Sequence, residues 1–266
     1  MYIWKIVLLG FIQGITEFFP ISSSGHLVIL KQVFGVQSPG VTLEVFLHTG
    51  TLLSVIFVFY REIWLLIKGF LNSIGISSEL EKKEYKKIFW LVILANIPVG
   101  IIGVFFKEYI EMFFKSSGFV FQFLIFTGLY LLLGRLVRKE IAKLKDISVL
   151  KSLIIGISQV LAVLPGVSRS GITITTGKLL NIDRNDAARF SFLIMIPAVA
   201  GATLMEVLEL NLSASQISYM ILGMLVSFVT GYIALKILLK IVKNYKFYYF
   251  SFYCILVGLT GIIFIG

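Results

Sequence analysis

The chain has 266 residues, of which 58% are hydrophobic and 14% are charged, and its formal net charge is +10. Soluble globular domains carry about a quarter charged residues, so this composition excludes a soluble domain and indicates a single polytopic membrane domain. The positive charge does not indicate nucleic-acid binding, because the basic residues lie in short loops between apolar stretches, where they set membrane orientation and contact lipid head groups.

The chain begins with an apolar stretch, residues 1–35, that is interrupted at "FPISSSG". Three continuous apolar stretches follow at 41–60, 88–106 and 119–134. A second interrupted stretch, 151–180, contains "LPGVSRSG", and three more continuous stretches follow at 187–206, 215–235 and 247–265. The six continuous stretches are long enough to be transmembrane helices, which need about 20 residues.

The two interrupted stretches are predicted to be re-entrant helix–loop–helix hairpins. About 15 residues precede each break and roughly 10 follow it, too few on either side to cross the bilayer. Broken backbone at membrane depth is tolerated only where protein or a water-filled cavity surrounds it. The predicted fold is therefore an all-α polytopic membrane protein with two re-entrant hairpins and about six transmembrane helices.

The two halves of the chain resemble each other. At an offset of 146 the matched pairs are Gly10 with Gly156, Gln13 with Gln159, Ser22 with Ser168, Ser24 with Ser170 and Gly25 with Gly171, and at offsets of 129 and 130 they are Phe121 with Phe250 and Gly128 with Gly258. The domain 1–266 is thus predicted to contain two repeats, 1–145 and 146–266, each with one hairpin and three crossings. Because three is odd, the second repeat is inverted relative to the first.

The distribution of basic residues predicts the orientation. With the N-terminus outside and neither hairpin crossing, 19 of the 24 basic residues lie on the cytoplasmic side, as expected for a membrane protein. These are Arg61, Lys68, Lys82, Lys83, Lys86, Lys87, Arg135, Arg138, Lys139, Lys143, Lys145, Lys151, Lys178, Arg184, Arg189, Lys236, Lys240, Lys243 and Lys246.

Scarce polar residues gather at the two breaks. An ionisable residue at the bilayer centre costs about 3 kcal/mol or more, so its presence indicates a function. Arginine offers a fork of donors to phosphoryl oxygens, and serine hydroxyls with glycine-flanked amides bind anions. A histidine can transfer a proton, and a glutamate can hold a divalent cation or orient the histidine. The candidate residues are Glu17, Ser22, Ser23, Ser24, Gly25, His26, Ser168, Arg169, Ser170 and Thr173.

Other interpretations of these residues stay open. Glu17 and Arg169 could form a structural ion pair, and serines in apolar helices often bond back to a carbonyl. His48, in "FLHTG", is left undecided with a structural role favoured. An inverted repeat with broken helices also fits a transporter or flippase of a polyprenyl phosphate or a small anion, and a third alternative is a purely structural membrane protein. A hydroxyl beside a potential base favours an enzyme.

The motifs "QGITEFFPISSSGHL" and "LPGVSRSGITI", supported by "LEVFLHTGTLLSV" and "AARFSFLIMIPAV", resemble the undecaprenyl-diphosphate phosphatases, also called bacitracin-resistance proteins. The resemblance implies a cell-membrane enzyme that releases one phosphate from undecaprenyl diphosphate and so recycles the lipid carrier of cell-wall synthesis. It also implies a divalent cation, Mg²⁺ or Ca²⁺. The family's acidic motif falls on Gln13 and Glu17, its serines and histidine on Ser22, Ser23 and His26, and its arginine on Arg169.

The predicted mechanism has Ser23 attack the terminal phosphorus while His26 handles the proton. Arg169 and a cation held by Glu17 and Gln13 stabilise the phosphoryl oxygens. In the rival mechanism His26, or a water that it activates, is the nucleophile. Ser22, Ser24, Gly25, Ser168, Ser170 and Thr173 are predicted to bind phosphate in a site that opens to the outer side. The expected partners are a polyprenyl diphosphate and membrane lipids, and whether the protein is a homodimer is left open.

Overall fold

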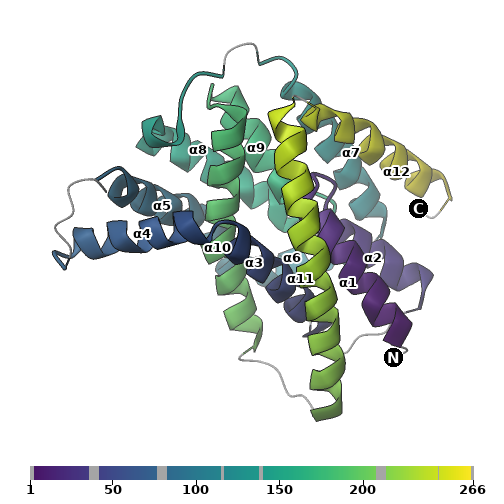
Figure 1. Ribbon diagram of the computed structural model, residues 1–266. Coiled ribbons are helices and arrows are strands. Elements are labelled where there is room, and N and C mark those ends of the chain that lie inside the picture. Colours follow the sequence, from purple (N-terminus) through teal and green to yellow (C-terminus); the bar gives the residue numbers. More distant parts are fainter. Residues whose placement is uncertain are drawn as a thin grey trace.

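The computed structural model describes residues 3–35, 42–76, 83–114, 117–137, 140–207, 214–244 and 246–264. These residues form α-helices and short 3₁₀ turns (Figure 1), and their one β feature is an isolated bridge between Ala142 and Ile182. The prediction of an all-α protein is confirmed.

Both predicted hairpins are present, each as two short helices around a break. The first consists of α1 (Ile3–Phe18) and α2 (Ser23–Val33), and the second of α8 (Val149–Val160), the turn η3 (Leu161–Val163) and α9 (Arg169–Leu179). The two helices of each hairpin contact each other. At a rise of about 1.5 Å per residue, none of the four reaches the roughly 30 Å thickness of the hydrocarbon core. The hairpins therefore enter and return.

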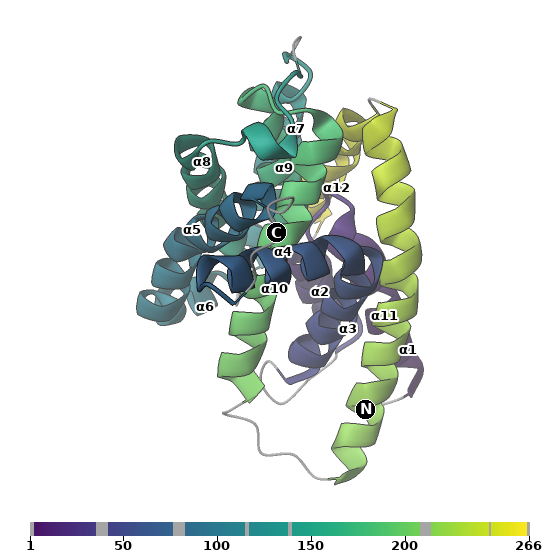
Figure 2. The ribbon, with the colours of Figure 1, turned by 60° about the vertical axis from the view of Figure 1, so that its left-hand side comes forward.

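Helices occupy all six predicted crossings. They are α3 (Thr42–Val58), α5 (Lys83–Phe105), α7 (Ser117–Leu133), α10 (Arg184–Val207), α11 (Ala214–Lys243) and α12 (Phe250–Phe264), the last preceded by the turn η4 (Phe247–Tyr249). Among the described residues, four helices are long and apolar enough to cross a membrane, and six if each bent pair is one span. The protein is thus an integral membrane protein. Helices α10 and α11 run steeply from top to bottom in both views (Figures 1 and 2).

The structure also contains elements that were not predicted: α4 (Tyr60–Ser73), α6 (Lys107–Phe114) and the turn η2 (Leu144–Asp146). Helix α4 bends away from α3 by 82°. It packs so closely on α5 that a Cβ added at Gly69 would lie 2.6 Å from the carbonyl carbon of Tyr85. Helix α4 lies between the predicted crossings 41–60 and 88–106, and its 14 residues are too few to be recognised as a crossing.

Helix packing in the two halves follows the same pattern. Helix α1 packs on α11 as α8 packs on α5, and α3 contacts α11 as α10 contacts α5. Where α7 meets α12, a Cβ on Gly128 would lie 2.8 Å from the Ser251 oxygen, and one on Gly258 would lie 2.7 Å from the Phe121 oxygen. This reciprocal contact is what a two-fold relation between the halves produces. The division of the chain into repeats 1–145 and 146–266 remains a prediction.

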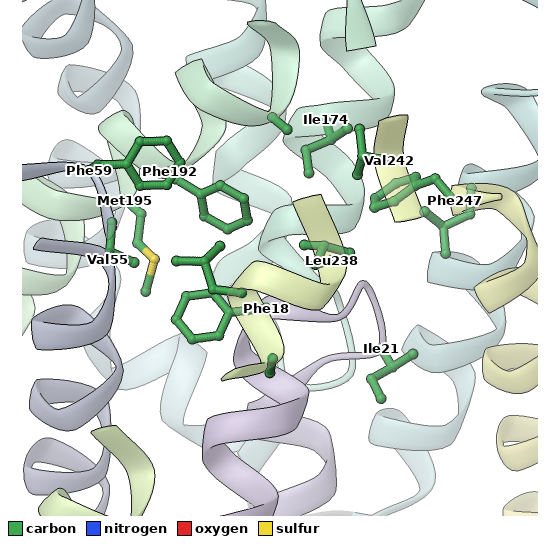
Figure 3. Packing of buried hydrophobic residues seen from close by; sticks show 14 of the residues in the cluster. Phe18, Ile21, Val55, Phe59, Ile174, Phe192, Met195, Leu238, Val242 and Phe247 are labelled. Carbon is green, nitrogen blue, oxygen red and sulfur yellow. The ribbon is translucent and has the colours of Figure 1, made fainter. Parts of the chain in front are cut away.

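A buried apolar cluster fixes the end of α1 (Figure 3). The Phe18 ring lies 5.8 Å from that of Phe192, which in turn lies 5.9 Å from the ring of Phe59, measured between ring centroids. Val55 and Met195 belong to the same cluster. Since lipid is as apolar as these side chains, close packing rather than removal from water stabilises such contacts. The cluster holds Phe18 in place and with it the adjacent Glu17.

Candidate active site

The two breaks meet in the structure. The Gly166 N–H donates to Ser22 Oγ at 3.1 Å, so a backbone amide of the second break contacts a hydroxyl of the first. The Thr127 hydroxyl of α7 donates to the Gly166 oxygen at 2.9 Å and accepts from the Ser168 N–H at 3.1 Å. Gly166 has φ +102°, and a Cβ there would lie 2.4 Å from the Val120 oxygen. Only glycine fits this position.

Serine hydroxyls cap both half-helices that begin at the breaks. Ser22 Oγ accepts from the Gly25 N–H at 3.3 Å, and Ser168 Oγ accepts from the Gly171 N–H at 3.1 Å. Ser22 has φ +66°, an unfavourable conformation for a residue other than glycine, and its hydrogen bonds to Gly25 and Gly166 hold it there. The N-terminal ends of α2 and α9, which carry partial positive charge, therefore lie together and favour an anion.

A buried carboxylate joins the two halves at this point. Arg169 Nη2 donates to Glu17 Oε1 at 2.9 Å. The other carboxylate oxygen, Oε2, accepts from Ser23 Oγ at 2.5 Å and from Gln13 Nε2 at 3.1 Å. The Glu17 side chain is 6% exposed and that of Arg169 is 13% exposed. The predicted acid, hydroxyl and arginine are thus in direct contact.

His48 of α3 also reaches this carboxylate. Its Nδ1 lies 3.0 Å from Gln13 Nε2 and 3.5 Å from Glu17 Oε2. Sequence interpretation favoured a structural role for this residue. The one signal in the sequence was a histidine inside an otherwise apolar crossing.

The His26 side chain faces Tyr253 of α12 rather than Glu17. Its Nδ1 donates to the Ser22 carbonyl oxygen at 2.8 Å, and its Nε2 accepts from the Tyr253 hydroxyl at 2.7 Å. The two rings are stacked, with centroids 5.7 Å apart. These contacts tie the first break to α12. The position of His26 gives no support to the predicted role in proton transfer.

A cavity of about 290 Å³ lies at the junction. Its polar lining contains Thr16, Glu17, Ser22, Ser23, Ser24, His48, Gln159, Ser168, Arg169 and Thr203, and its apolar lining includes Val99, Phe114, Ala162, Val163, Ala198, Val199 and Ala202. Thr16, His48, Gln159 and Thr203 had not been predicted as site residues, because they lie outside the two breaks.

Three of the six predicted phosphate-binding residues do not line the cavity: Gly25, Ser170 and Thr173. The Gly25 amide is used by the Ser22 cap. Ser170 Oγ lies 3.3 Å from Ser168 Oγ, and Thr173 Oγ1 lies 2.6 Å from Ser191 Oγ. All three support the breaks rather than face the cavity.

Three buried polar atoms of the site have no hydrogen-bond partner among the described residues: Arg169 Nη1, a donor, and Gln13 Oε1 and Gln159 Oε1, both acceptors. Such atoms are costly unless a ligand satisfies them. Within the same residues, no three His, Cys, Asp or Glu side chains gather in one place. A divalent cation beside Glu17 would therefore need other donors, and Gln13 provides an oxygen there only if its amide is turned, because its Nε2 faces Glu17 in the structure.

Comparison with known proteins establishes the family. The family described as Bacitracin resistance protein BacA matches residues 6–260. The chain belongs to the BacA family. Curated relatives named undecaprenyl-diphosphatase span the whole chain. That of Methanosphaera stadtmanae is 39% identical over 269 residues, which is 98% of this chain and 97% of the relative. That of Alkaliphilus metalliredigens is 39% identical over 275 residues, which is 99% of each chain.

In this member of the BacA family, each half of the chain supplies one part of the site. Glu17 and Ser23 come from the first hairpin and Arg169 from the second, 152 residues after Glu17. The carboxylate accepts the hydroxyl proton of Ser23 in a hydrogen bond, and the arginine keeps one unpaired donor beside them. This combination suits nucleophilic attack on a phosphoryl group.

Proposed function

We propose that this protein is an undecaprenyl-diphosphate phosphatase, which hydrolyses undecaprenyl diphosphate to undecaprenyl phosphate and phosphate and so recycles the carrier for cell-wall synthesis. The observation that carries the proposal is the buried contact of Ser23 and Arg169 with opposite oxygens of Glu17, with Arg169 Nη1 left without a partner among the described residues. The names of the full-length relatives agree with it.

In the first step Ser23 Oγ attacks the terminal phosphorus. Its proton passes to Glu17 Oε2, the atom that already accepts its hydrogen bond at 2.5 Å. The bond from phosphorus to the bridging oxygen breaks, the lipid leaves as its monophosphate, and Glu17 gives the proton to that leaving group, so that its carboxylate is ionised again. Arg169 Nη1 donates to a phosphoryl oxygen and stabilises the charge that develops there. Glu17 thus takes the role in proton transfer that had been predicted for His26.

In the second step water attacks the phosphorylated Ser23 and gives a proton to Glu17. The Oγ–phosphorus bond breaks, phosphate leaves, and Ser23 recovers its proton. Glu17 and Gln13, the latter with its amide turned so that the oxygen faces Glu17, would hold a divalent cation, Mg²⁺ or Ca²⁺, and the cation would supply positive charge to the diphosphate. With Gln13 neutral, Glu17 is the one anionic ligand of this pair.

The cavity suits a lipid diphosphate. Its lining combines the polar side chains of Glu17, Ser23 and Arg169 with small apolar side chains such as Ala198 and Ala202. The head group can thus reach the serine while the prenyl chain stays against apolar surface. No observation favours the transporter alternative, because translocation needs no hydroxyl hydrogen-bonded to a carboxylate.

The proposed function is tested by phosphate release from purified protein. We expect release from undecaprenyl diphosphate, loss of release on addition of a chelator, and recovery when a divalent cation is restored. Absence of release with cations present would contradict the phosphatase assignment. Release that is unaffected by exhaustive chelation would contradict the cation requirement alone.

The orientation is part of the proposal: the site opens to the outer side of the cell membrane. The support is the bias of basic residues toward one side. A Lys83→Cys variant in a Cys254→Ser background should resist an impermeant thiol reagent added to intact cells, whereas Lys115→Cys should react. Lys115 lies outside the described residues, and Cys254 is buried. Labelling at position 83 from outside would reverse the proposed topology.

A further inference from the structure

Gln159 is a buried amide in the cavity lining to which the proposed mechanism gives no role. The residue is 1% exposed, and it lines the same cavity as Ser23 and Glu17. It stands one residue before the end of α8, just ahead of the second break. The second half of the chain therefore brings a neutral polar side chain to the cavity in addition to its arginine.

Hydrogen bonds to α5 fix the orientation of this amide. Asn96 Nδ2 donates to the Val92 carbonyl oxygen at 2.8 Å, and a carbonyl oxygen can only accept. Asn96 Oδ1 therefore faces Gln159, whose Nε2 donates to it at 3.3 Å. Close packing of α8 on α5 supports this contact, because a Cβ on Gly156 would lie 2.3 Å from the Ala95 oxygen. The amide oxygen of Gln159, Oε1, is the atom left to bind another group.

Gln159 Oε1 is buried and has no hydrogen-bond partner among the described residues. Among the described side chains that line the cavity, the one other buried polar atom in this condition is Arg169 Nη1, a donor. An acceptor left in this way is costly, so a donor is expected to bind it when the site is occupied. An ionised diphosphate offers acceptor oxygens, whereas water offers two O–H donors. Water is the ligand that fits this oxygen.

The second step of the proposed reaction needs an oriented water. Once Ser23 carries phosphate it has no hydroxyl hydrogen to donate, so Glu17 Oε2, which accepts from it at 2.5 Å, can accept from water instead. A water held by one acceptor can still rotate about that hydrogen bond, whereas two acceptors fix the direction of its lone pairs. The cavity of about 290 Å³ has room for such a water, which takes about 10–15 Å³ of this space.

We propose that Gln159 Oε1 accepts one hydrogen of the water that hydrolyses phosphorylated Ser23, while Glu17 takes the other as a proton. This inference rests on the proposed phosphatase function. The water oxygen forms a bond to phosphorus, the bond from phosphorus to Ser23 Oγ breaks, and Glu17 returns its proton to Oγ. The hydrogen held by Gln159 stays on the released phosphate. Glutamine orients the attacking water in GTP hydrolysis in the same way. Gln159 is thus a positioning residue for the second step alone.

The test separates the two steps by rapid acid quenching of the purified full-length protein with undecaprenyl diphosphate. In Gln159→Leu we expect a normal first turnover of undecaprenyl phosphate, followed by phosphate release about 10²-fold slower than in the wild type, the usual effect of a misplaced reactant. Phosphorylated Ser23 should accumulate. The matched control is Ser158→Ala on the same helix, because the Ser158 hydroxyl returns to the Ile155 carbonyl. This control should show neither change.

A purely structural role for Gln159 would slow both steps together, because a displaced α8 would disturb the first transfer as well. Slower turnover of Gln159→Leu without accumulation of phosphorylated enzyme would therefore overturn the inference, and so would unchanged turnover. In both cases phosphate release by the wild-type chain would still uphold the phosphatase function. Absence of release by the wild type would reject the function and the inference together.

A measurement on the wild-type protein decides the inference even if Gln159→Leu does not fold. Vanadate bound to Ser23 adopts the five-coordinate shape of phosphoryl transfer, with the attacking water as the axial ligand opposite Oγ. A structure of this complex should place Gln159 Oε1 within about 3.2 Å of the axial oxygen, the usual limit of a hydrogen bond. An axial oxygen out of hydrogen-bond reach of Gln159 would overturn the inference.

Discussion

We expect Arg169→Lys to lower the rate of phosphate release by a factor of about 10²–10³, the usual effect of losing one preorganised contact to a developing charge. Lysine keeps the positive charge but lacks the planar fork. Arg169 uses Nη2 for Glu17 Oε1 and has Nη1 without a partner among the described residues. A single ammonium group cannot serve Glu17 and a phosphoryl oxygen in the same geometry.

The measurement is kcat/KM for undecaprenyl diphosphate in detergent. The matched control is Arg189→Lys, because the Arg189 side chain is half exposed, pairs with Glu62 and Asp186, and does not line the cavity. This control should retain its activity. Near-normal turnover of Arg169→Lys would show that the unpaired guanidinium donor does not act on the substrate.

Ser23→Ala should lower turnover by at least about 10³, since removing a catalytic nucleophile leaves only the catalysis that binding and charge stabilisation provide. It should also prevent formation of a phosphorylated enzyme. Acid quenching during turnover, followed by mapping of the modified residue, should place phosphate on Ser23 in the wild-type chain.

The control for Ser23→Ala is Ser158→Ala, because the Ser158 hydroxyl returns to the Ile155 carbonyl within α8. Its turnover should stay near that of the wild type. Phosphate found on His26, or substantial turnover by Ser23→Ala, would contradict the serine mechanism and favour the rival in which His26, or a water that it activates, attacks.

The hairpins and the six crossings could be predicted because apolar length and polar breaks are local properties of the sequence. Helix α4 could not, since an amphipathic helix at the end of a crossing leaves no break to signal it. The two histidines show a further limit. His26 turns away because its Nδ1 bonds the Ser22 carbonyl, four residues earlier. His48 reaches Glu17 because α3 packs on α1, and that packing is not visible in the sequence.

The hydroxyl of Ser22 has a consequence for inhibition. It accepts N–H groups from both halves, Gly25 in the first and Gly166 in the second. Losing it leaves two buried donors unpaired, at about 1–3 kcal/mol each. A compound that binds at this junction would contact Ser22, a residue whose substitution lowers the stability of the protein. Escape from such a compound by substitution at Ser22 would weaken the fold at the point where the two halves are joined.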